Sequence, residues 1–245
     1  MAPERDDEAS PRGEPGPTAP GQRVGILGGT FDPVHLGHLV TARDVAEGLG
    51  LDRILLIPAG VPPHKEGEVT APAAFRRRML EVAVAGDPLF QVDSLELERE
   101  GPSYTVDTLR ELGARWPGVE LFLLMGTDQW RDFATWKQAA EVAQRATVTV
   151  MTRTGDEPAE MKSAKHFPFA GVAVTRMDIS SSELRARIRA GRSVRYLVPP
   201  DVEALLTQEG GVYGSPPGQG SAAGASSPSG EGSTTGDTQP YGIEA

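Results

Sequence analysis

The chain has 245 residues, no cysteine, 38% hydrophobic residues and a formal net charge of −10. The lack of cysteine excludes a disulfide scaffold and a thiol nucleophile, and it favours a reducing, cytoplasmic location. The acidic balance argues against a partner such as nucleic acid, and no apolar run is long enough to predict a membrane span.

The two ends of the chain have no hydrophobic period. Residues 1–22 are acidic and rich in proline, without the apolar core of a signal peptide, and residues 214–245 are rich in Gly, Ser, Pro and Thr. Neither segment can bury enough apolar surface to offset its chain entropy, so both are predicted to be disordered tails. We expect one folded domain over residues 23–213.

Strand and helix patterns alternate along this domain. In chain order they predict strand 23–27, helix 36–49, strand 53–58, helix 74–86, strand 90–93, helix 105–116, strand 120–126, helix 138–146, strands 147–151 and 172–176, and helices 181–191 and 201–211. This alternation predicts an α/β fold with a doubly wound, mostly parallel sheet and helices on both faces. Ligands of such sheets bind at the carboxyl ends of the strands, here the junctions 28–38, 58–66, 125–136 and 177–185.

The first junction reads GGTFDPVHLGHL over residues 28–39. Gly28 and Gly29 allow a tight turn and a close approach of backbone N–H groups to a phosphate. Asp32 is a favoured N-cap residue and Pro33 suits the first helical turn, so the pair predicts that a helix begins here.

Two histidines follow at a spacing of three residues. On a helix, His35 and His38 lie on one face, next to the partial positive charge of the helix N-terminus. The arrangement predicts a polyphosphate site, while a metal pair or two capping histidines are also compatible with it. No metal ligand set is predicted, because the sequence has no HExxH pattern and no evident third ligand. The phosphate loops GxxxxGK[ST] and GxGxxG are missing.

Five segments carry a family resemblance. They are GGTFDPVHLGHL (28–39), IPAGVPPHK (57–65), SYTVDTL (103–109), MGTDQW (125–130) with TW (135–136), and DISSSELRARI (178–188). In this order they resemble the nicotinate-nucleotide adenylyltransferases of the HxGH nucleotidylyltransferase superfamily. The resemblance implies a Rossmann-like fold of the nucleotidylyltransferase type. It also implies transfer of the adenylyl group of ATP to nicotinate mononucleotide, giving deamido-NAD and pyrophosphate in NAD biosynthesis, with Mg²⁺ carried by ATP.

The resemblance implies roles for residues at the ATP site. His38 and His35 are expected at the α- and β-phosphates, Thr30 at the transferred phosphate, and Arg185 at the β- and γ-phosphates. The other residues implied in ATP binding are Gly28, Gly29, Phe31, Gly126, Asp128, Asp178, Ile179, Ser180, Ser181 and Ser182. Among these, Asp128 is expected to accept from ribose hydroxyls, and Asp178 and Ile179 to flank the adenosine. N-capping is the alternative role for the serines and for Asp128, and Arg185 taken alone is compatible with a surface arginine.

The resemblance implies that nicotinate mononucleotide is bound by Trp136, Thr105 and Lys65. Trp136 is expected to stack on the pyridine ring, and Thr105 to bind the carboxylate mainly through its backbone N–H. Lys65 adds positive potential in a proline-rich loop. A core tryptophan and a solvated basic turn are the alternatives. The chain departs from the family at Lys137, where an aromatic residue is common, and at the SSS-E-L-R segment, where SST-x-I-R is more usual.

Two other functions are compatible with these motifs. A sister adenylyltransferase would use nicotinamide mononucleotide, or both forms. A non-catalytic nucleotide-binding protein would share the fold but would be expected to have a broken motif, whereas His35, His38 and Arg185 are all present. The sequence is also compatible with a homo-oligomer.

Overall fold

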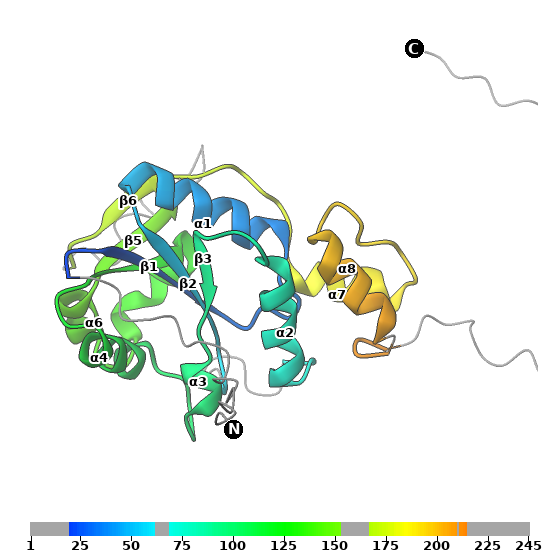
Figure 1. Ribbon diagram of the computed structural model, residues 1–245, viewed down its shortest axis with the longest axis horizontal. Helices are drawn as coiled ribbons and strands as arrows, with labels where there is room; N and C mark the ends of the chain where they lie inside the picture. Colours follow the sequence, from blue (N-terminus) through cyan, green and yellow to red (C-terminus); the bar gives the residue numbers. More distant parts are fainter. Residues whose placement is uncertain (1–19, 62–68, 153–166, 210, 215–245) are drawn as a thin grey trace, which may run out of the picture.

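The computed structural model describes residues 20–61, 69–152, 167–209 and 211–214. These residues form a sheet in the order β3-β2-β1-β4-β5-β6, in which every pair of neighbouring strands is parallel (Figure 1). The strands are β1 (Arg23–Gly29), β2 (Arg53–Pro58), β3 (Phe90–Val92), β4 (Glu120–Gly126), β5 (Thr147–Thr152) and β6 (Ala170–Ala173). The predicted doubly wound parallel sheet is confirmed. Nearly all of both predicted tails, residues 1–19 and 215–245, lies outside the described residues.

The central strands are apolar on both faces because helices cover both sides of the sheet. Side chains alternate between the faces: Leu27 of β1 belongs to one apolar core, while Ile26 belongs to the other. Parallel pairing sets Ile26 beside Leu55 of β2 and Leu123 of β4, and all three side chains pack in the same core. Continuous runs such as ILLI and LFLLM are therefore buried on both sides.

The helices divide between the two cores. They are α1 (Leu36–Leu49), α2 (Ala73–Ala83), α3 (Leu95–Glu98), α4 (Thr105–Arg115), α5 (Thr127–Asp132), the 3-10 helix η1 (Phe133–Thr135), α6 (Ala139–Arg145), α7 (Ser181–Arg189) and α8 (Pro200–Gln208). Helices α1, α2, α7 and α8 contribute to one core, and α3, α4, α5 and α6 to the other. Figure 1 shows α7 and α8 together beside α2, and α8 packs on α2.

Several predicted boundaries move. Strand β6 covers residues 170–173, not 172–176, because Ala170–Ala173 pair with Thr149–Thr152 of β5. Helix α2 ends at Ala83, three residues before the predicted end, and Gly86 takes a positive φ of 82° in the turn that follows. The short helices α3, α5 and η1 are not predicted from the sequence.

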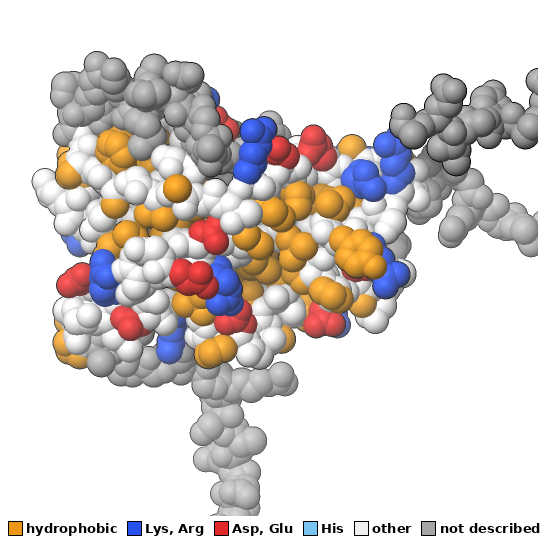
Figure 2. Space-filling view, turned by 90° about the horizontal axis from the view of Figure 1, so that it is seen from above, with side chains coloured by type: hydrophobic (Ala, Val, Ile, Leu, Met, Phe, Trp, Pro, Cys, Tyr) orange, Lys and Arg blue, Asp and Glu red, His pale blue; other side chains and the backbone are white. Residues whose placement is uncertain are grey.

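The surface of the described residues carries both signs of charge. On the face shown in Figure 2, Lys and Arg side chains lie interspersed with Asp and Glu side chains around an apolar centre. Within the part of the chain that the structure describes, no helix combines the length and the apolar character needed to cross a membrane.

Candidate active site

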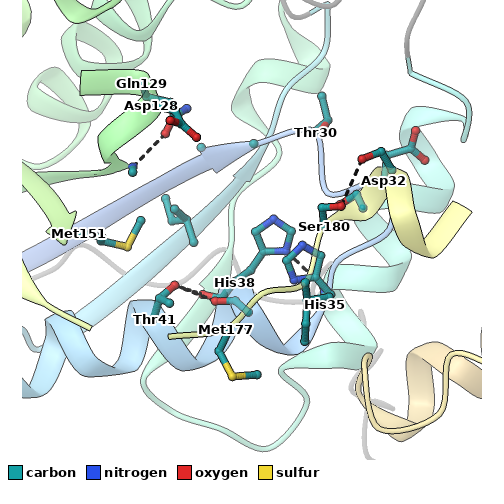
Figure 3. Close-up of a pocket in the computed structure, with 18 of the residues that line it drawn as sticks. Thr30, Asp32, His35, His38, Thr41, Asp128, Gln129, Met151, Met177 and Ser180 are labelled. Carbon is teal, nitrogen blue, oxygen red and sulfur yellow. Dashed lines mark hydrogen bonds between the residues drawn. The ribbon is translucent and has the colours of Figure 1, made fainter. Parts of the chain in front are cut away.

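A cavity of about 670 Å³ opens where β1 and β4 end (Figure 3). Its position is the one expected for a ligand of a doubly wound sheet, since β1 and β4 lie where the strand order reverses. Three of the four predicted junctions contribute to its wall. The lining includes Gly28, Gly29, Thr30, Asp32, His35, Gly37, His38, Thr41, Val69, Gly126, Thr127, Asp128, Gln129, Arg131, Met151, Val174, Met177, Ile179, Ser180, Ser181, Ser182 and Arg185.

The prediction that Asp32 caps helix α1 is wrong. Helix α1 begins at Leu36 and its N-cap residue is His35, which has an extended backbone. Asp32 is followed by Pro33 through a cis peptide bond, and its side chain is only 1% exposed. The buried carboxylate accepts hydrogen bonds from the backbone N–H groups of Thr70 and Ala71 and from the Tyr213 hydroxyl. A buried carboxylate needs such donors, so Asp32 ties the turn to two distant segments instead of capping the helix.

Arg76 of α2 also holds this turn in place. Its side chain is buried and donates to the carbonyl groups of Thr30, Ala59 and Ala71. Burial lowers the pKa of Arg76, while the nearby charge of Asp32 acts in the opposite direction. The turn that follows β1 is therefore fixed by a buried pair of opposite charges and by several backbone contacts.

The two histidines lie together as predicted, although only His38 belongs to the helix and His35 precedes it. The rings of His35 and His38 stack with centroids 3.7 Å apart and planes inclined by 25°. The His35 backbone N–H donates to Nδ1 of His38 at 3.2 Å, so a neutral His38 carries its proton on Nε2. Phe31 meets the His38 ring edge-on at 5.0 Å and is itself 1% exposed, which places its side chain in the core under the turn.

His35 is buried and uncharged at neutral pH. Its residue is 6% exposed, and burial lowers its pKa to about 4. Within the described residues, its Nδ1 atom has no hydrogen-bond partner. A Cβ atom at Gly37 would lie 2.9 Å from this Nδ1, so the glycine between the two histidines leaves room for the ring. The HLGH sequence thus combines two stacked imidazoles with the residue that lets them stack.

Helix α7 closes the opposite wall of the cavity. Ser180 is its N-cap residue and accepts from the backbone N–H of Glu183 at 3.3 Å, so capping is its structural role. Ser181 donates to the carbonyl of Pro33 at 2.8 Å, and Ser182 lies within hydrogen-bond distance of Ser180. These contacts join α7 to the turn after β1, although the two segments are far apart in the sequence.

Arg185 lies on the cavity side of α7 and is not a free surface arginine. Its side chain is 18% exposed, and Nη1 donates to the Asp32 carbonyl at 2.8 Å. Nη1 is also 3.9 Å from the carboxylate oxygen Oδ2 of Asp32. Nε is buried and has no hydrogen-bond partner among the described residues.

The end of β4 forms the rim of the cavity. Gly126 is the N-cap residue of α5, and its N–H donates to the side-chain oxygen of Gln129 at 3.3 Å. Asp128 is therefore not the cap: its side chain is 89% exposed and forms an ion pair with Arg131. The structure adds lining residues that the sequence reasoning missed, among them Thr41, Gln129, Met151 and Met177. Thr41 lies three residues after His38 on α1, a spacing that identifies it in retrospect.

Four predicted site residues that the structure describes do not line this cavity: Phe31, Asp178, Thr105 and Trp136. Asp178 forms an ion pair with Arg176 beside a neighbouring hollow. Thr105 begins α4, and Trp136 is half-buried against Phe133 with ring centroids 5.5 Å apart. Lys65 lies outside the described residues.

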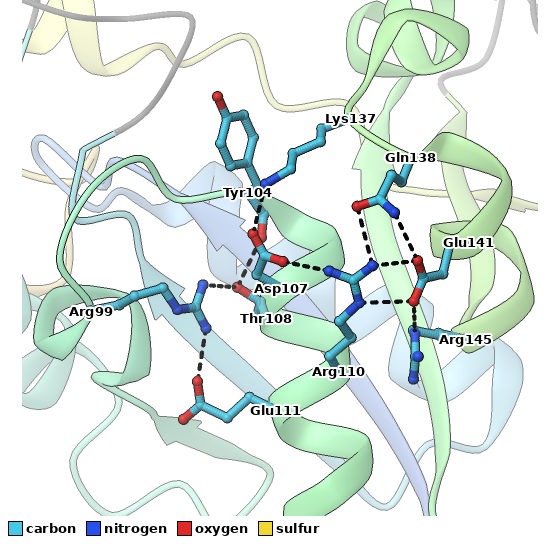
Figure 4. A network of polar contacts seen from close by, with 10 residues as sticks. All are labelled: Arg99, Tyr104, Asp107, Thr108, Arg110, Glu111, Lys137, Gln138, Glu141 and Arg145. Atoms are coloured by element: carbon cyan, nitrogen blue, oxygen red, sulfur yellow. Dashed lines mark hydrogen bonds and ion pairs between the residues drawn. The ribbon is translucent and has the colours of Figure 1, made fainter.

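Lys137 belongs to a polar network between α4 and α6 (Figure 4). Its ammonium lies 4.0 Å from the centre of the Tyr104 ring and 3.1 Å from a carboxylate oxygen of Asp107. Arg110 joins Asp107 to Glu141, and hydrogen bonds from Arg110 and Arg145 lower the pKa of Glu141 to about 2. The departure from the family at Lys137 thus places a paired cation next to Trp136.

Comparison with known proteins gives one consistent result. The chain matches the cytidylyltransferase-like family over residues 26–187. A relative from Thermus thermophilus, named a probable nicotinate-nucleotide adenylyltransferase, is 46% identical over 188 residues, which are 77% of this chain and 98% of the relative. A protein of the same name from Geobacillus thermodenitrificans is 41% identical over 193 residues, or 79% of this chain and 87% of the relative.

A solved structure supports the fold. Plasmodium falciparum nicotinic acid mononucleotide adenylyltransferase, complexed with APC, superposes with a TM-score of 0.63 at 15% identity, over 77% of this chain and 96% of that one. At this level of identity the likeness shows the fold alone, which is the predicted nucleotidylyltransferase type.

Proposed function

The chain belongs to the nicotinate-nucleotide adenylyltransferases of the cytidylyltransferase-like family, and we propose that the cavity between β1, β4 and α7 is where it binds ATP. Enzymes of this kind transfer the adenylyl group of ATP to nicotinate mononucleotide. The observation that carries the assignment of the site is the stacked pair of His35 and His38, which faces the same cavity as Arg185.

The reaction requires charge stabilisation and positioning, and no protein nucleophile. A phosphate oxygen of nicotinate mononucleotide attacks the α-phosphorus of ATP, the bond from that phosphorus to the bridging oxygen breaks, and pyrophosphate leaves with the electron pair. Negative charge moves toward the β-phosphate in this step. Hydrogen-bond donors that are already in place stabilise such charge without reorganisation.

The histidines supply donors for the α- and β-phosphates. His38 accepts at Nδ1, so its Nε2–H is the donor for a phosphate oxygen. His35 is neutral in the free enzyme, and a phosphate placed beside it would favour its protonated form. The turn at Gly28, Gly29 and Thr30 brings backbone N–H groups to the same cavity.

Arg185 and the start of α7 are assigned to the β- and γ-phosphates. The guanidinium is always charged and presents paired donors that fit phosphate oxygens. In the described structure its Nε has no acceptor, which leaves a donor for an anionic ligand. Ser182 precedes it by one helical turn at the positive end of α7; its hydroxyl is 3.2 Å from that of Ser180, while Ser180 and Ser181 are bound to the backbone.

The remaining wall of the cavity suits adenosine. Met151, Val174, Met177 and Ile179 supply apolar contacts, and Thr41 adds a hydroxyl. The carboxylate of Asp128 is exposed at the rim, where it can accept from ribose hydroxyls at the cost of a surface ion pair worth less than about 1 kcal/mol. Gly126 leaves the rim open beside it, and Asp178 is assigned to the outer edge of the adenosine site.

We assign the pyridine nucleotide to the side of the site near α4. Thr105 opens that helix, where backbone N–H groups have no acceptor within the helix and suit a carboxylate. Trp136 offers a half-buried ring for stacking. Lys137 follows Trp136 in the sequence. We propose that its ammonium and that of Lys65 favour binding of the acid, nicotinate mononucleotide, over the amide.

Mg²⁺ is proposed to arrive with ATP. Among the described residues, no group of three or more His, Cys, Asp or Glu side chains is placed to hold a metal ion. The carboxylate of Asp32 is occupied by backbone and tyrosine donors. Mg²⁺ commonly binds substrate phosphates and water with few protein ligands, and it would neutralise phosphate charge in this site. The cysteine-free sequence supports a cytoplasmic location.

The decisive experiment measures pyrophosphate release with ATP and Mg²⁺, comparing nicotinate mononucleotide with nicotinamide mononucleotide. We expect the acid to be preferred and His38→Ala to lower kcat by about 10²-fold or more, the effect of losing one donor to a transition-state charge. Arg185→Ala should raise KM for ATP, while Arg187→Ala, at an arginine of the same helix that does not line the cavity, serves as the matched control. A preference for the amide would identify the sister activity, and full activity of His38→Ala would refute the site.

A further inference from the structure

A tyrosine near the end of the described chain reaches the turn after β1. Tyr213 is 3% exposed, and its hydroxyl donates to Oδ1 of Asp32 at 2.8 Å across 181 positions of sequence. Its carbonyl accepts from Nε of Arg189 at 3.2 Å, which fixes its backbone to α7. The ring packs in the core shared by α1, α2, α7 and α8. Tyr213 therefore connects the C-terminal helices directly to the predicted phosphate site.

The tyrosine hydroxyl completes the shell of donors around a buried carboxylate. Oδ1 of Asp32 accepts from Tyr213 and from the Ala71 N–H, and Oδ2 accepts from the Thr70 N–H. Burial and the charge of Asp32 raise the pKa of Tyr213, so the hydroxyl stays protonated and remains a donor. If the hydroxyl were removed, Oδ1 would keep a single hydrogen-bond donor. A buried carboxylate that lacks a donor attracts another donor within reach.

Arg185 is a donor within reach of this carboxylate. Its Nη1 is already 3.9 Å from Oδ2 of Asp32, and its Nε has no partner among the described residues. A small rotation of the guanidinium would form a two-bond pair with the carboxylate, the arrangement that arginine and carboxylate prefer. The same rotation would withdraw the guanidinium from the cavity that it lines. Asp32 and a nucleotide phosphate thus compete for one guanidinium.

We propose that Tyr213 is a positioning residue for ATP binding: by satisfying Asp32, it keeps Arg185 directed at the cavity and available to the phosphates. This inference rests on the assignment of Arg185 to ATP in the proposed function. Tyr213 does not touch the substrate in this scheme, and it acts only through Asp32 and Arg185. The substrate group that it controls is the β- and γ-phosphate end of the nucleotide.

The test is a double-mutant cycle with Tyr213→Phe, Arg185→Ala and the combination of both. Tyr213→Phe removes only the hydroxyl, and Tyr196→Phe makes the same change at a tyrosine that is 79% exposed. The full-length variants are compared by the Kd for ATP, measured by calorimetry, and by KM and kcat. Kd reports on all variants, including those that are too slow to assay. A melting temperature for each variant shows that ATP is offered to folded protein.

We expect Tyr213→Phe to weaken ATP binding about tenfold, comparable to one hydrogen bond to a charged group. Tyr196→Phe should bind like the wild type. In the Arg185→Ala background, Tyr213→Phe should change Kd less than about twofold, because the guanidinium it controls is gone.

Three outcomes would overturn the proposal. Unchanged ATP affinity in Tyr213→Phe would show that the hydroxyl does not influence Arg185. Equal losses in the presence and absence of Arg185 would show that Tyr213 acts through general stability of the turn. If Arg185→Ala alone binds ATP like the wild type, the assigned role of Arg185 fails, and this proposal fails with it, while the effect of His38→Ala still tests the site separately.

Discussion

Protonation of His35 should destabilise the folded protein in mild acid. The residue is 6% exposed, and burial lowers the pKa of its side chain from 6.5 to about 4. Above pH 6.5 the histidine is neutral in both the folded and the unfolded chain, so it does not change the free energy of unfolding. As the pH falls below 6.5, the unfolded chain binds a proton that the folded chain does not, and the free energy of unfolding decreases until the pH reaches about 4.

The size of this effect follows from the two pKa values. Each pH unit between them is equivalent to about 1.4 kcal/mol, so the loss is about 2 kcal/mol at pH 5 and about 3 kcal/mol once the folded chain also binds the proton. A loss of this size is a large fraction of the stability of a typical domain, which is about 5–15 kcal/mol.

The assay is urea unfolding of the wild type and His35→Gln at about pH 7.5 and pH 5, followed by circular dichroism. Carboxylates contribute to the pH dependence of both proteins, so the difference between them isolates the histidine. We expect the variant to be less stable at pH 7.5, since it loses the stacked ring, but to lose about 2 kcal/mol less on acidification. Equal losses in the two proteins would refute the account of a buried, neutral His35.

Three further predictions concern the surroundings of the site. Gly37→Ala should displace the His35 ring and lower kcat about tenfold or more. The control Gly113→Ala in α4, where a new Cβ meets nothing within 4 Å, should keep full activity and raise the free energy of unfolding by about 0.5–1 kcal/mol. Equal kcat values for the two variants would contradict this. Burial raises the pKa of Glu96, so the wild type should lose stability as pH rises above the ordinary glutamate value, and thermal melts of Glu96→Gln should lack this slope. Lys137→Gln should raise KM for nicotinate mononucleotide by up to about fivefold and leave KM for the amide unchanged, as steady-state kinetics would show.

Strong local patterns predicted most of the fold. Strands such as Glu120–Gly126 are continuous apolar runs, so both their existence and their burial could be predicted from composition alone. Helix α5 was missed because its six residues contain a single buried side chain, Trp130, and no repeating apolar face. The position of β6 depends on pairing with β5, which no local pattern specifies.

In the candidate site, too, local features could be predicted and features that depend on distant contacts could not. The pairing of the two histidines was predicted correctly, although His35 precedes the helix as its N-cap residue and its backbone N–H donates to His38. Asp32 was misplaced because its donors, Thr70, Ala71 and Tyr213, come from distant parts of the sequence. A local rule made it an N-cap residue, whereas tertiary contacts make it a buried anchor. Met151 was missed for a related reason: it enters the cavity only because β5 lies next to β4.

The order of the strands has a consequence for aggregation. It leaves the two shortest described strands, β3 with three residues and β6 with four, at the outer edges of the sheet. An edge strand recruits other chains through its unpaired backbone groups, and a short one offers few of them. The long apolar strands β1 and β4, which end at the candidate site, are enclosed at the centre of the sheet. The fold thereby keeps the strands that would pair most readily with another copy of the chain away from the sheet edges.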